Sequence, residues 1–584
     1  MKMKVSDYIA KFFEKKGLKH LFMLAGGGCI HMVDSFGRSE IDAIPMIHEQ
    51  GAAIAAEAYA QYTNEPSALL VTTGPGGTNA ITGVTSAWLD SVPMVVLSGQ
   101  VQRKDMIGDT GCRQIGFQEV DIVPMVSSIT KYAKTIMHAE DIPVQLAKAY
   151  DLANMGRKGP VWLDIPLDIQ SAEIDVSDAK ETFYREEMIP ELDMSVVAGG
   201  LGAATMLHAS RRPIILLGNG ARSSIDFFLH LLDVTGVPVM TTWKAADLIP
   251  EDHPLFVGRP GGIAQRGANL AQQEADLIIC IGARLDHGQT GYRPDLFAKD
   301  AKKVIVDVSM QEAYKHPFAH ESGTLNVIGQ ASDFIREFRM APHMDTRIRS
   351  QFSDWRKRCR QLKAENSVIT DVHRETLNPY SFIDALSDAM DGDEILVPGS
   401  SGTVAEVTMQ AFRVKHGQRI INSQGLGSMG FALPAAIGVA FASGKRVVCL
   451  DGDGSFAMNM QEMAVVAKHS LPIKIFIFNN GGYVSIRNTQ DKLFNGEYVG
   501  SADSGINFSE LFAAFDITPA EVLLDSEDLL GRLLFFIGSP IPELYDVRMS
   551  KKHQTVPRTK SYMNDDGQME TAPMDDLYMG DNDG

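Results

Sequence analysis

The 584-residue sequence lacks any apolar run of about 18 residues, so no part of it is expected to cross a membrane as a helix. It also lacks a basic surplus: the formal net charge is −19, which argues against nucleic acid or an anionic membrane as a partner. Cysteine is scarce, with five scattered residues that lie mostly in apolar stretches. Because such a set forms no disulfide framework, we predict reduced, buried thiols in a cytoplasmic protein.

The remaining composition is that of a globular protein, with 45% apolar and 22% charged residues. The length predicts about three or four domains. Residues 1–17 predict an amphipathic charged helix, which is not the pattern of a signal peptide. Residues 342–378 are highly charged and predict a solvated linker helix. The polar, acidic tail at 553–584 predicts disorder.

The most informative stretch spans residues 446–490. A short apolar run ends in the sequence DGDGS at 451–455, a helical pattern follows, and a second apolar run ends in two asparagines at 479–480. This order predicts a βαβ unit with polar residues where both strands end, which is where open parallel sheets bind ligands. Glycine amides at a helix N-terminus favour a phosphate, and oxygens of Asp453, Asn480 and Gly482 suit Mg²⁺. A lone GDG would be a tight turn, but the combination favours a metal–diphosphate site.

The same alternation of strand, glycine turn and helix occurs in three parts of the chain. Residues 1–180 show it before the segments at 26–28, 48–50 and 73–79. Residues 190–341 show it before the segments at 218–222 and 282–286, and residues 379–552 show it again. Repeated units of this kind specify doubly wound parallel sheets. We therefore predict an α/β protein with three such domains, joined by the linker at 342–378.

Glu49 is the first residue of a predicted helix made of alanine and glycine. A carboxylate in such an apolar setting could transfer protons near neutral pH. The alternative is an ordinary acidic residue favoured by the helix macrodipole. A zinc-binding HExxH motif is excluded because Ala52 stands in place of the second histidine. The residues alone leave the first two interpretations equally open.

Several of these segments resemble one known family. The GDGS and NN pair, HEQGAA at 48–53, TGPGGTN at 73–79 and GLGSMGFALPAA at 425–436 are similar to segments of thiamine-diphosphate (ThDP) enzymes. Over nearly the whole chain the likeness is to the acetohydroxyacid synthase branch. It implies that Asp453, Asn480 and Gly482 hold Mg²⁺ and that Glu49 hydrogen-bonds N1′ of the aminopyrimidine. That contact favours the imino tautomer, which removes the thiazolium C2 proton to make the ylid.

The resemblance implies further cofactor and substrate contacts. Pro75 and Asn79 meet the pyrimidine edge, and Met429 holds the cofactor in its bent conformation. Phe117 and Gln118, in a segment similar to the family's AFQE, face the substrate from the neighbouring subunit. By themselves they would be a core aromatic and a solvated amide. The other candidates follow strands or glycine turns: Gly27 and Gly28 as catalytic residues, and Gly399, Ser400, Ser401, Gly427, Gly452, Gly454, Ser455 and Tyr483 as cofactor-binding residues.

The middle domain resembles the FAD-binding domain of the same branch. A lone GxG is weak, and such domains can bind nothing. However, GAR-x-D at 282–286 matches the flavin segment, and in that family the flavin is structural rather than redox-active. The resulting candidates are Arg157, Gly218, Gly220, Thr242, Trp243, Gly282, Arg284, Asp286 and Asp307. The family also implies a site shared between subunits, hence a homodimer or homotetramer, and a tail that can act as a lid.

The substrate side departs from acetohydroxyacid synthase. The tryptophan that selects the acceptor aligns with Thr489, and a nearby methionine aligns with Ser485. An arginine aligns with Gly288, and a lysine aligns with Leu167. The cofactor positions are kept while the acceptor positions change, which predicts the same chemistry with a different acceptor.

This pattern resembles the YerE-type carboligases, which add a pyruvate-derived acetyl unit to a ketone or keto-sugar. One alternative is the catalytic subunit of an ordinary acetolactate synthase. The other, of a different class, is a non-catalytic binding protein that retains the fold.

Overall fold

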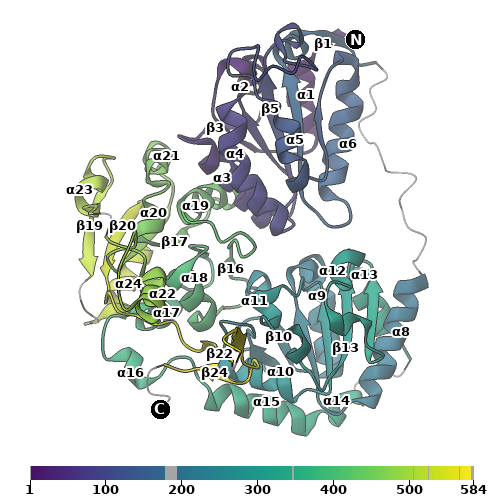
Figure 1. Ribbon diagram of the computed structural model, residues 1–584, viewed down its shortest axis with the longest axis vertical. Coiled ribbons are helices and arrows are strands. Elements are labelled where there is room, and N and C mark those ends of the chain that lie inside the picture. Colours follow the sequence, from purple (N-terminus) through teal and green to yellow (C-terminus); the bar gives the residue numbers. More distant parts are fainter. Residues whose placement is uncertain are drawn as a thin grey trace.

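The computed structural model describes residues 2–580 except 178–193, 343, 345, 346, 504, 524, 526 and 565. It contains three parallel sheets of six strands each, which confirms the predicted fold class. In Figure 1 the sheet of the N-terminal residues is at the top, the middle sheet at the lower right and the last sheet at the left. We call the three parts the pyrimidine, central and diphosphate domains, after the role that the sequence predicts for each.

The strands of each sheet lie side by side in an order that differs from their order along the chain. Across its sheet, the pyrimidine domain has β3 (Asp42–Pro45), β2 (His20–Met23), β4 (Ser67–Val71), β5 (Met94–Gln100), β7 (Pro160–Pro166) and β6 (Ala133–Thr135). The central domain has β11 (Phe256–Gly258), β10 (Val239–Thr241), β9 (Pro213–Leu217), β12 (Leu277–Ile281), β13 (Lys302–Asp307) and β14 (Thr324–Ile328). The diphosphate domain has β16 (Arg419–Ile420), β15 (Ile395–Pro398), β17 (Val447–Gly452), β18 (Ile473–Asn479), β20 (Glu543–Arg548) and β19 (Thr518–Leu523).

Helices cover both faces of these sheets. The pyrimidine domain has α1 (Val5–Lys15), α2 (Ile30–Gly37), α3 (Glu49–Thr63), α4 (Pro75–Leu89), α5 (Ile122–Val126), α6 (Ile142–Asn154) and α7 (Leu167–Ser171). The central domain has α8 (Met194–Ala209), α9 (Ile225–Thr235), α10 (Arg266–Glu274), α11 (His287–Thr290), α12 (Met310–Ala313) and α13 (Ala331–Met340), followed by α14 (Ile348–Gln351), α15 (Ser353–Glu365) and α16 (Asp371–Arg374). The diphosphate domain has α17 (Pro379–Ala389), α18 (Gly402–Ala411), α19 (Ala432–Ser443), α20 (Asp453–Phe456), α21 (Met463–His469), α22 (Val484–Phe494), α23 (Phe508–Ala513) and α24 (Leu529–Gly538).

The strand orders divide the three sheets into two kinds. Numbered along the chain, the central strands run 3-2-1-4-5-6, the order of dinucleotide-binding folds. The pyrimidine and diphosphate strands both run 2-1-3-4-6-5. These two domains therefore share one topology, although the residues that follow their strands differ.

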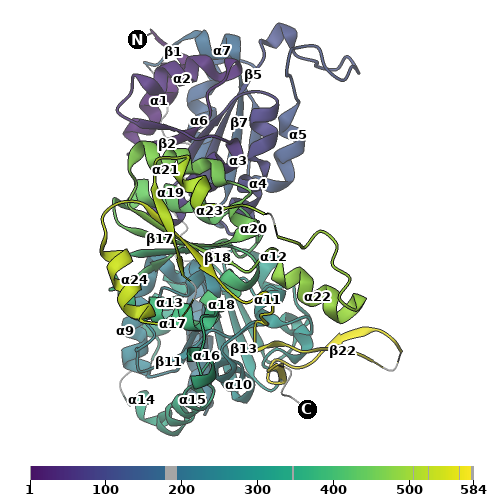
Figure 2. The same ribbon diagram turned by 90° about the vertical axis from the view of Figure 1, so that its left-hand side faces the viewer.

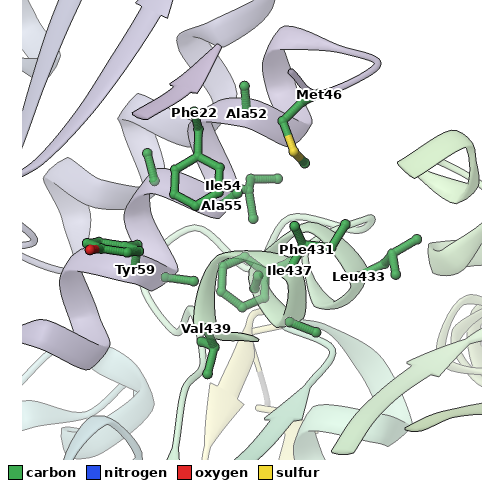
Figure 3. Packing of buried hydrophobic residues seen from close by; sticks show 14 of the residues in the cluster. Phe22, Met46, Ala52, Ile54, Ala55, Tyr59, Phe431, Leu433, Ile437 and Val439 are labelled. Carbon is green, nitrogen blue, oxygen red and sulfur yellow. The ribbon is translucent and has the colours of Figure 1, made fainter. Parts of the chain in front are cut away.

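The pyrimidine and diphosphate domains pack together through α3 and α19 (Figure 3). The contact is close because small residues face each other: a Cβ on Gly438 would lie 2.1 Å from the Ala55 carbonyl oxygen. Larger apolar side chains surround it, with Phe22 and Ile54 on one side and Phe431 on the other (Figure 3). The alanine and glycine content of both helices is thus explained by the short distance between them.

Three predictions outside the sheets need correction. The linker helix α15 is not simply solvated, because it buries Trp355, Cys359 and Leu362 against the central domain. The described part of the tail is folded: it contributes short strands, and Met574 enters the same core. Cys112 is exposed, whereas the other four free cysteines are buried as predicted.

These differences have a common cause, since sequence composition reports average polarity and not which face of a segment meets another domain. Within the described residues, no helix is long and apolar enough to span a membrane. The amphipathic helix predicted near the N-terminus is α1, which buries the aromatic residues Tyr8, Phe12 and Phe13.

Candidate active site

Glu49 is the first residue of α3 and lies four residues after the end of β3. Its side chain is only 6% exposed, and its Oε2 accepts a hydrogen bond of 3.0 Å from the Asn79 amide. His48 caps the helix, because its Nδ1 accepts the Gln50 N–H at 3.1 Å. Glu49 and Asn79, both predicted from the sequence, therefore meet at the carboxyl end of the first sheet.

Glu462 is a carboxylate near Glu49 that the sequence interpretation missed. It lies in the diphosphate domain, yet its two oxygens accept the N–H groups of Ile47 and His48 at 3.1 and 3.0 Å. A Cβ on Gly51 would lie 2.4 Å from Glu462 Oε1, which explains the glycine in HEQGAA. Burial raises the pKa of Glu462 to about 7. The only sequence signal was an acid in an apolar helical pattern.

The predicted metal ligands lie together where β17 and β18 end. Asp453 begins α20, and its Oδ2 accepts the Gly482 N–H at 2.7 Å. Burial raises the pKa of the Asp453 carboxyl, and hydrogen bonds from Gly482 and Gly454 oppose this shift. Asn480 is 8% exposed, and its Oδ1 is buried without a hydrogen-bond partner. A buried amide oxygen of this kind needs a partner, and a cation would supply one.

The turn after Asn480 is held by a residue that the sequence did not single out. Arg487 on α22 is buried; its Nη2 donates to the Asn480 carbonyl at 2.7 Å and its Nη1 donates to the Gly481 carbonyl. Gly482 has φ +109°, and a Cβ there would lie 2.6 Å from the Ser501 carbonyl oxygen. Only glycine fits this position.

Within the described residues no group of three His, Cys, Asp or Glu side chains could hold a metal ion. The predicted set differs in kind, because it combines one carboxylate, one amide and one backbone carbonyl. Such a set suits Mg²⁺ whose remaining positions are filled by diphosphate oxygens and water.

The glycine loops predicted for the diphosphate lie beside these ligands. Ser400 donates to the Ser428 carbonyl, and the Ser455 hydroxyl accepts the Gly430 N–H at 2.9 Å. Ser455 therefore joins the GDGS loop to the segment of Met429, which is half-buried. A Cβ on Gly454 would lie 2.5 Å from the Tyr483 ring, so this glycine makes room for the aromatic side chain.

Two more turns of the diphosphate side have hydrogen-bonded amides: the Gly399 N–H donates to the Leu450 carbonyl at 2.6 Å and the Gly452 N–H donates to Asp451 Oδ1 at 3.0 Å. Gly399 follows β15, and Ser401 precedes α18 without capping it through its side chain. Gly427 has φ +64°, and a Cβ on Gly452 would meet no atom within 4 Å. The buried Oδ2 of Asp451 and the Ser428 hydroxyl also lack hydrogen-bond partners. Buried oxygens without partners fit the surroundings of a bound cation.

A cavity of about 280 Å³ lies between the three domains at the carboxyl edge of the central sheet. Seven predicted flavin residues line it: Arg157, Gly220, Thr242, Gly282, Arg284, Asp286 and Asp307. Gly218 instead packs against the Gly282 backbone, and Trp243 packs against the core of the diphosphate domain. Cationic side chains that the sequence did not single out also line the cavity, namely Lys158, Arg222, Lys244 and Arg419.

Ion pairs organise this cavity. Arg157 Nη2 lies 2.5 Å from Asp307 Oδ1, and Arg284 Nη2 lies 2.9 Å from Asp286 Oδ2. Lys244 pairs with the buried Asp90 at 3.0 Å, which joins the central and pyrimidine domains. The Arg157 Nε is buried without a hydrogen-bond partner. The cationic lining and this unpartnered donor fit an anionic dinucleotide.

The remaining predicted residues lie on the outside of the pyrimidine domain. Phe117 is 86% exposed, and Gln118 is also exposed and has φ +62°. Gly27 is exposed in a 3₁₀ turn (Gly27–Cys29), whereas Gly28 donates to the Thr72 hydroxyl at 3.1 Å. Phe117 is thus not a core aromatic.

Two of the substituted acceptor positions lie on one face of α22, and the other two lie on the short helices α11 and α7. Ser485 and Thr489 are exposed, and the Thr489 hydroxyl donates to the Ser485 carbonyl at 3.1 Å. A Cβ on Gly402 would lie 3.3 Å from the Ser485 hydroxyl, so this face lies beside the diphosphate loop. Gly288 is exposed on α11, and Leu167 is half-buried at the start of α7.

Comparison with known proteins agrees with this geometry. Three family models match in chain order: the N-terminal thiamine pyrophosphate (TPP) binding domain over residues 3–125, the central domain over 202–338 and the C-terminal TPP binding domain over 400–537. The chain therefore belongs to the thiamine pyrophosphate enzymes.

Within that class the relatives are acetolactate synthases. The chain is 30% identical over 555 residues to acetolactate synthase isozyme 1 large subunit of Escherichia coli (strain K12), covering 94% of this chain and 95% of the relative. It is 31% identical over 570 residues to acetolactate synthase 2, chloroplastic, of Zea mays, covering 96% and 87%. The protein is thus a ThDP-dependent, acetolactate synthase-like enzyme.

Proposed function

We propose that this enzyme decarboxylates pyruvate and transfers the resulting acetyl unit to a ketone or keto-sugar, forming a carbon–carbon bond. The observation that carries the proposal is the exposed face of α22. There the short polar side chains of Ser485 and Thr489 lie beside the diphosphate loop. The resemblance aligns these two positions with a methionine and a tryptophan, which are larger. A wider, more polar pocket favours a larger, oxygen-rich acceptor.

Residues of two domains contribute to the proposed reaction. Bound ThDP supplies the electron sink that makes loss of CO₂ from a 2-oxo acid possible. Glu49 would hold or release a proton at the aminopyrimidine edge, and Asn79 fixes its carboxylate. Glu462 accepts the backbone N–H groups just before Glu49 and so fixes the position of Glu49 at the start of the helix.

The opposite end of the cofactor would be held by the diphosphate domain. Asp453, Asn480 and the Gly482 carbonyl would bind Mg²⁺, and Arg487 would keep the turn that carries two of these ligands in place. Pro75 and Met429 would fix the pyrimidine and the bend of the cofactor. The glycine turns that contain Gly399, Gly452 and Gly454 would lie along the diphosphate.

We also propose that the cavity of the central domain holds FAD as a structural group. Its support is the dinucleotide-type strand order together with the cationic lining, which includes Arg157 and Arg284. The purified protein is then expected to be yellow, and its absorbance spectrum would test this.

A second copy of the chain would complete the site. Phe117 is almost fully exposed next to Gln118, as expected for side chains that enter a neighbouring subunit. We propose a homodimer or homotetramer, which the mass in solution would test.

The four buried free thiols support a reducing, cytoplasmic setting.

The test is product analysis by mass spectrometry. Purified protein with ThDP and Mg²⁺ is given pyruvate and a panel of aldehydes, ketones and keto-sugars. Acetyl adducts of ketones or keto-sugars are the expected products. Acetolactate alone would instead identify an ordinary acetolactate synthase, and absence of CO₂ release would point to a non-catalytic relative.

A single substitution sharpens the assignment of the acceptor. Thr489→Trp restores the large side chain, so it should lower ligation to ketones by at least about tenfold while CO₂ release from pyruvate is kept. Asn488→Gln, a polar change one residue away, serves as the control. Equal loss with all acceptors in the Thr489→Trp variant would contradict a role in acceptor choice.

A further inference from the structure

The segment between β5 and α5 carries Phe117 and Gln118 and extends from the pyrimidine domain (Figure 2). The buried carboxylate of Glu119 holds the part of this segment nearest to the domain. Glu119 accepts the N–H groups of Ile115 and Gly116 at 3.1 and 3.0 Å, and it also accepts that of Ile107. Residue 107 is therefore tied to the turn at 115–119, and Phe117 is left outside.

Gln118 adopts a backbone conformation that needs support from its surroundings. Its φ of +62° lies in the left-handed region, which non-glycine residues rarely adopt. Its carbonyl oxygen lies so close to Gly74 that a Cβ there would be 2.3 Å away, and the Thr73 hydroxyl lies 3.4 Å from the same oxygen. Strain of this kind persists only where neighbouring contacts impose it.

A chain of buried polar groups provides those contacts. Gln100, the last residue of β5, accepts the Thr73 hydroxyl at 2.9 Å and donates to the Val120 carbonyl at 2.9 Å. The first bond keeps the Thr73 hydroxyl beside the Gln118 carbonyl, and the second holds the backbone two residues after Gln118. The same Gln100 amide nitrogen donates to Asp164 Oδ2 at 3.1 Å, which fixes the orientation of the amide.

Asp164 is itself held rigidly inside the sheet. It lies in β7 and accepts hydrogen bonds from the Ser98 hydroxyl at 2.6 Å and the Thr135 hydroxyl at 3.2 Å. Burial raises its pKa to about 7. Burying a carboxyl group inside a sheet costs free energy, and an apolar residue would pack there without that cost.

We propose that Gln100 and Asp164 are positioning residues that impose the strained conformation of Gln118 and so aim Phe117 and Gln118 at the acceptor. Neither residue is expected to touch substrate or cofactor. Their effect on the reaction rests on the proposed function. Their effect on the segment does not, because the hydrogen bonds that carry it lie within one chain.

The first test measures the segment directly. Hydrogen exchange of peptides covering residues 106–121 is followed in the whole enzyme. Gln100→Met keeps the size of the side chain but removes its hydrogen bonds, and it should speed exchange in this segment by at least about tenfold. Asp164→Asn leaves one acceptor oxygen for the three donors Gln100, Ser98 and Thr135. It should act in the same direction, which provides a second variant if the first folds poorly.

A matched control separates this effect from general loosening. Gln272→Met makes the same change at a fully buried glutamine of α10 in the central domain. It should leave exchange at 106–121 unchanged. If the segment exchanges at the wild-type rate in both Gln100→Met and Asp164→Asn, the proposal is overturned.

The second test separates positioning from the proposed function. In Gln100→Met the KM for the acceptor should rise at least about tenfold, while the KM for pyruvate and the rate of CO₂ release stay within about threefold. Faster exchange with an unchanged acceptor KM would overturn the aiming role. A wild-type enzyme that releases no CO₂ from pyruvate would instead refute the proposed function, and the exchange result would still decide the structural part.

Discussion

The pyrimidine and diphosphate domains have the same strand order but different chemistry at equivalent strand ends. After the third strand of the chain order, one domain continues into Pro75 and Asn79 and the other into Asp453. After the second strand, one begins a helix with Glu49 and the other continues into the segment of Met429. The scaffold thus determines where ligands bind, and the few residues after each strand determine which end of the cofactor is bound.

The largest expected effect tests the acid on the pyrimidine side. Glu49→Gln keeps the size of the side chain but cannot exchange a proton, so turnover should fall by about 10³-fold or more. Calorimetry should show Mg²⁺–ThDP binding within about threefold of wild type, because the diphosphate side is untouched. Wild-type turnover would remove the proposed mechanism.

On the diphosphate side, the expected change is in the affinity of the protein for ThDP. Asn480→Ala removes the unpartnered amide oxygen, so Mg²⁺-dependent binding of ThDP should weaken by about 100-fold. Asn479→Ala at the adjacent asparagine is the control and should stay within about threefold. Equal affinity for both variants, measured by calorimetry, would exclude Asn480 as a ligand.

The contact between the two domains can be tested through a glycine. Gly51→Ala places a Cβ 2.4 Å from Glu462 Oε1, so it should lower the free energy of unfolding by about 2 kcal/mol. Gly37→Ala, where a Cβ meets no atom within 4 Å, should cause little change. Urea unfolding measures both variants, and similar stability for the two would mean that Glu462 yields without cost.

The last prediction concerns a difference between the two facing helices, and its effect changes gradually with pH. α19 has no charged residue, whereas α3 buries Glu57, whose pKa is raised to about 8 by burial and by Asp90. Because the folded pKa exceeds the unfolded value, this group stabilises the fold fully only at low pH. Its contribution is lost as the pH rises from about 4.5 to about 8, by about 1.4 kcal/mol per unit at most.

Glu57→Gln removes that dependence. The free energy of unfolding of the variant should therefore rise relative to wild type across this pH window and run parallel to it above about pH 8. Urea titrations at several pH values measure the difference in the free energy of unfolding between variant and wild type. A gap that narrows with rising pH would mean that Glu57 is ionised and paired in the fold.

The sequence was sufficient for the fold class because the glycine turns follow apolar runs at regular intervals. The resemblance also assigned Glu49 and Asn79 to the same pyrimidine edge, and their side chains do meet, although β2 lies between the strands that precede them. The sequence did not reveal Glu462, because its partners are backbone groups of a distant segment that only the folded chain brings near. It did not reveal Arg487 either, because its partners are backbone carbonyls, which no residue pattern marks. The folded tail was missed for the same reason: Asn269 in the central domain donates to the Met574 carbonyl at 2.8 Å.

The exposed Cys112 has a practical consequence, since the other four thiols are buried. A maleimide dye should react at this one position in the native enzyme. It would sit five residues from Phe117, on the segment proposed to enter a neighbouring subunit. Energy transfer between dyes in mixed populations would then report the exchange of subunits without any engineered cysteine.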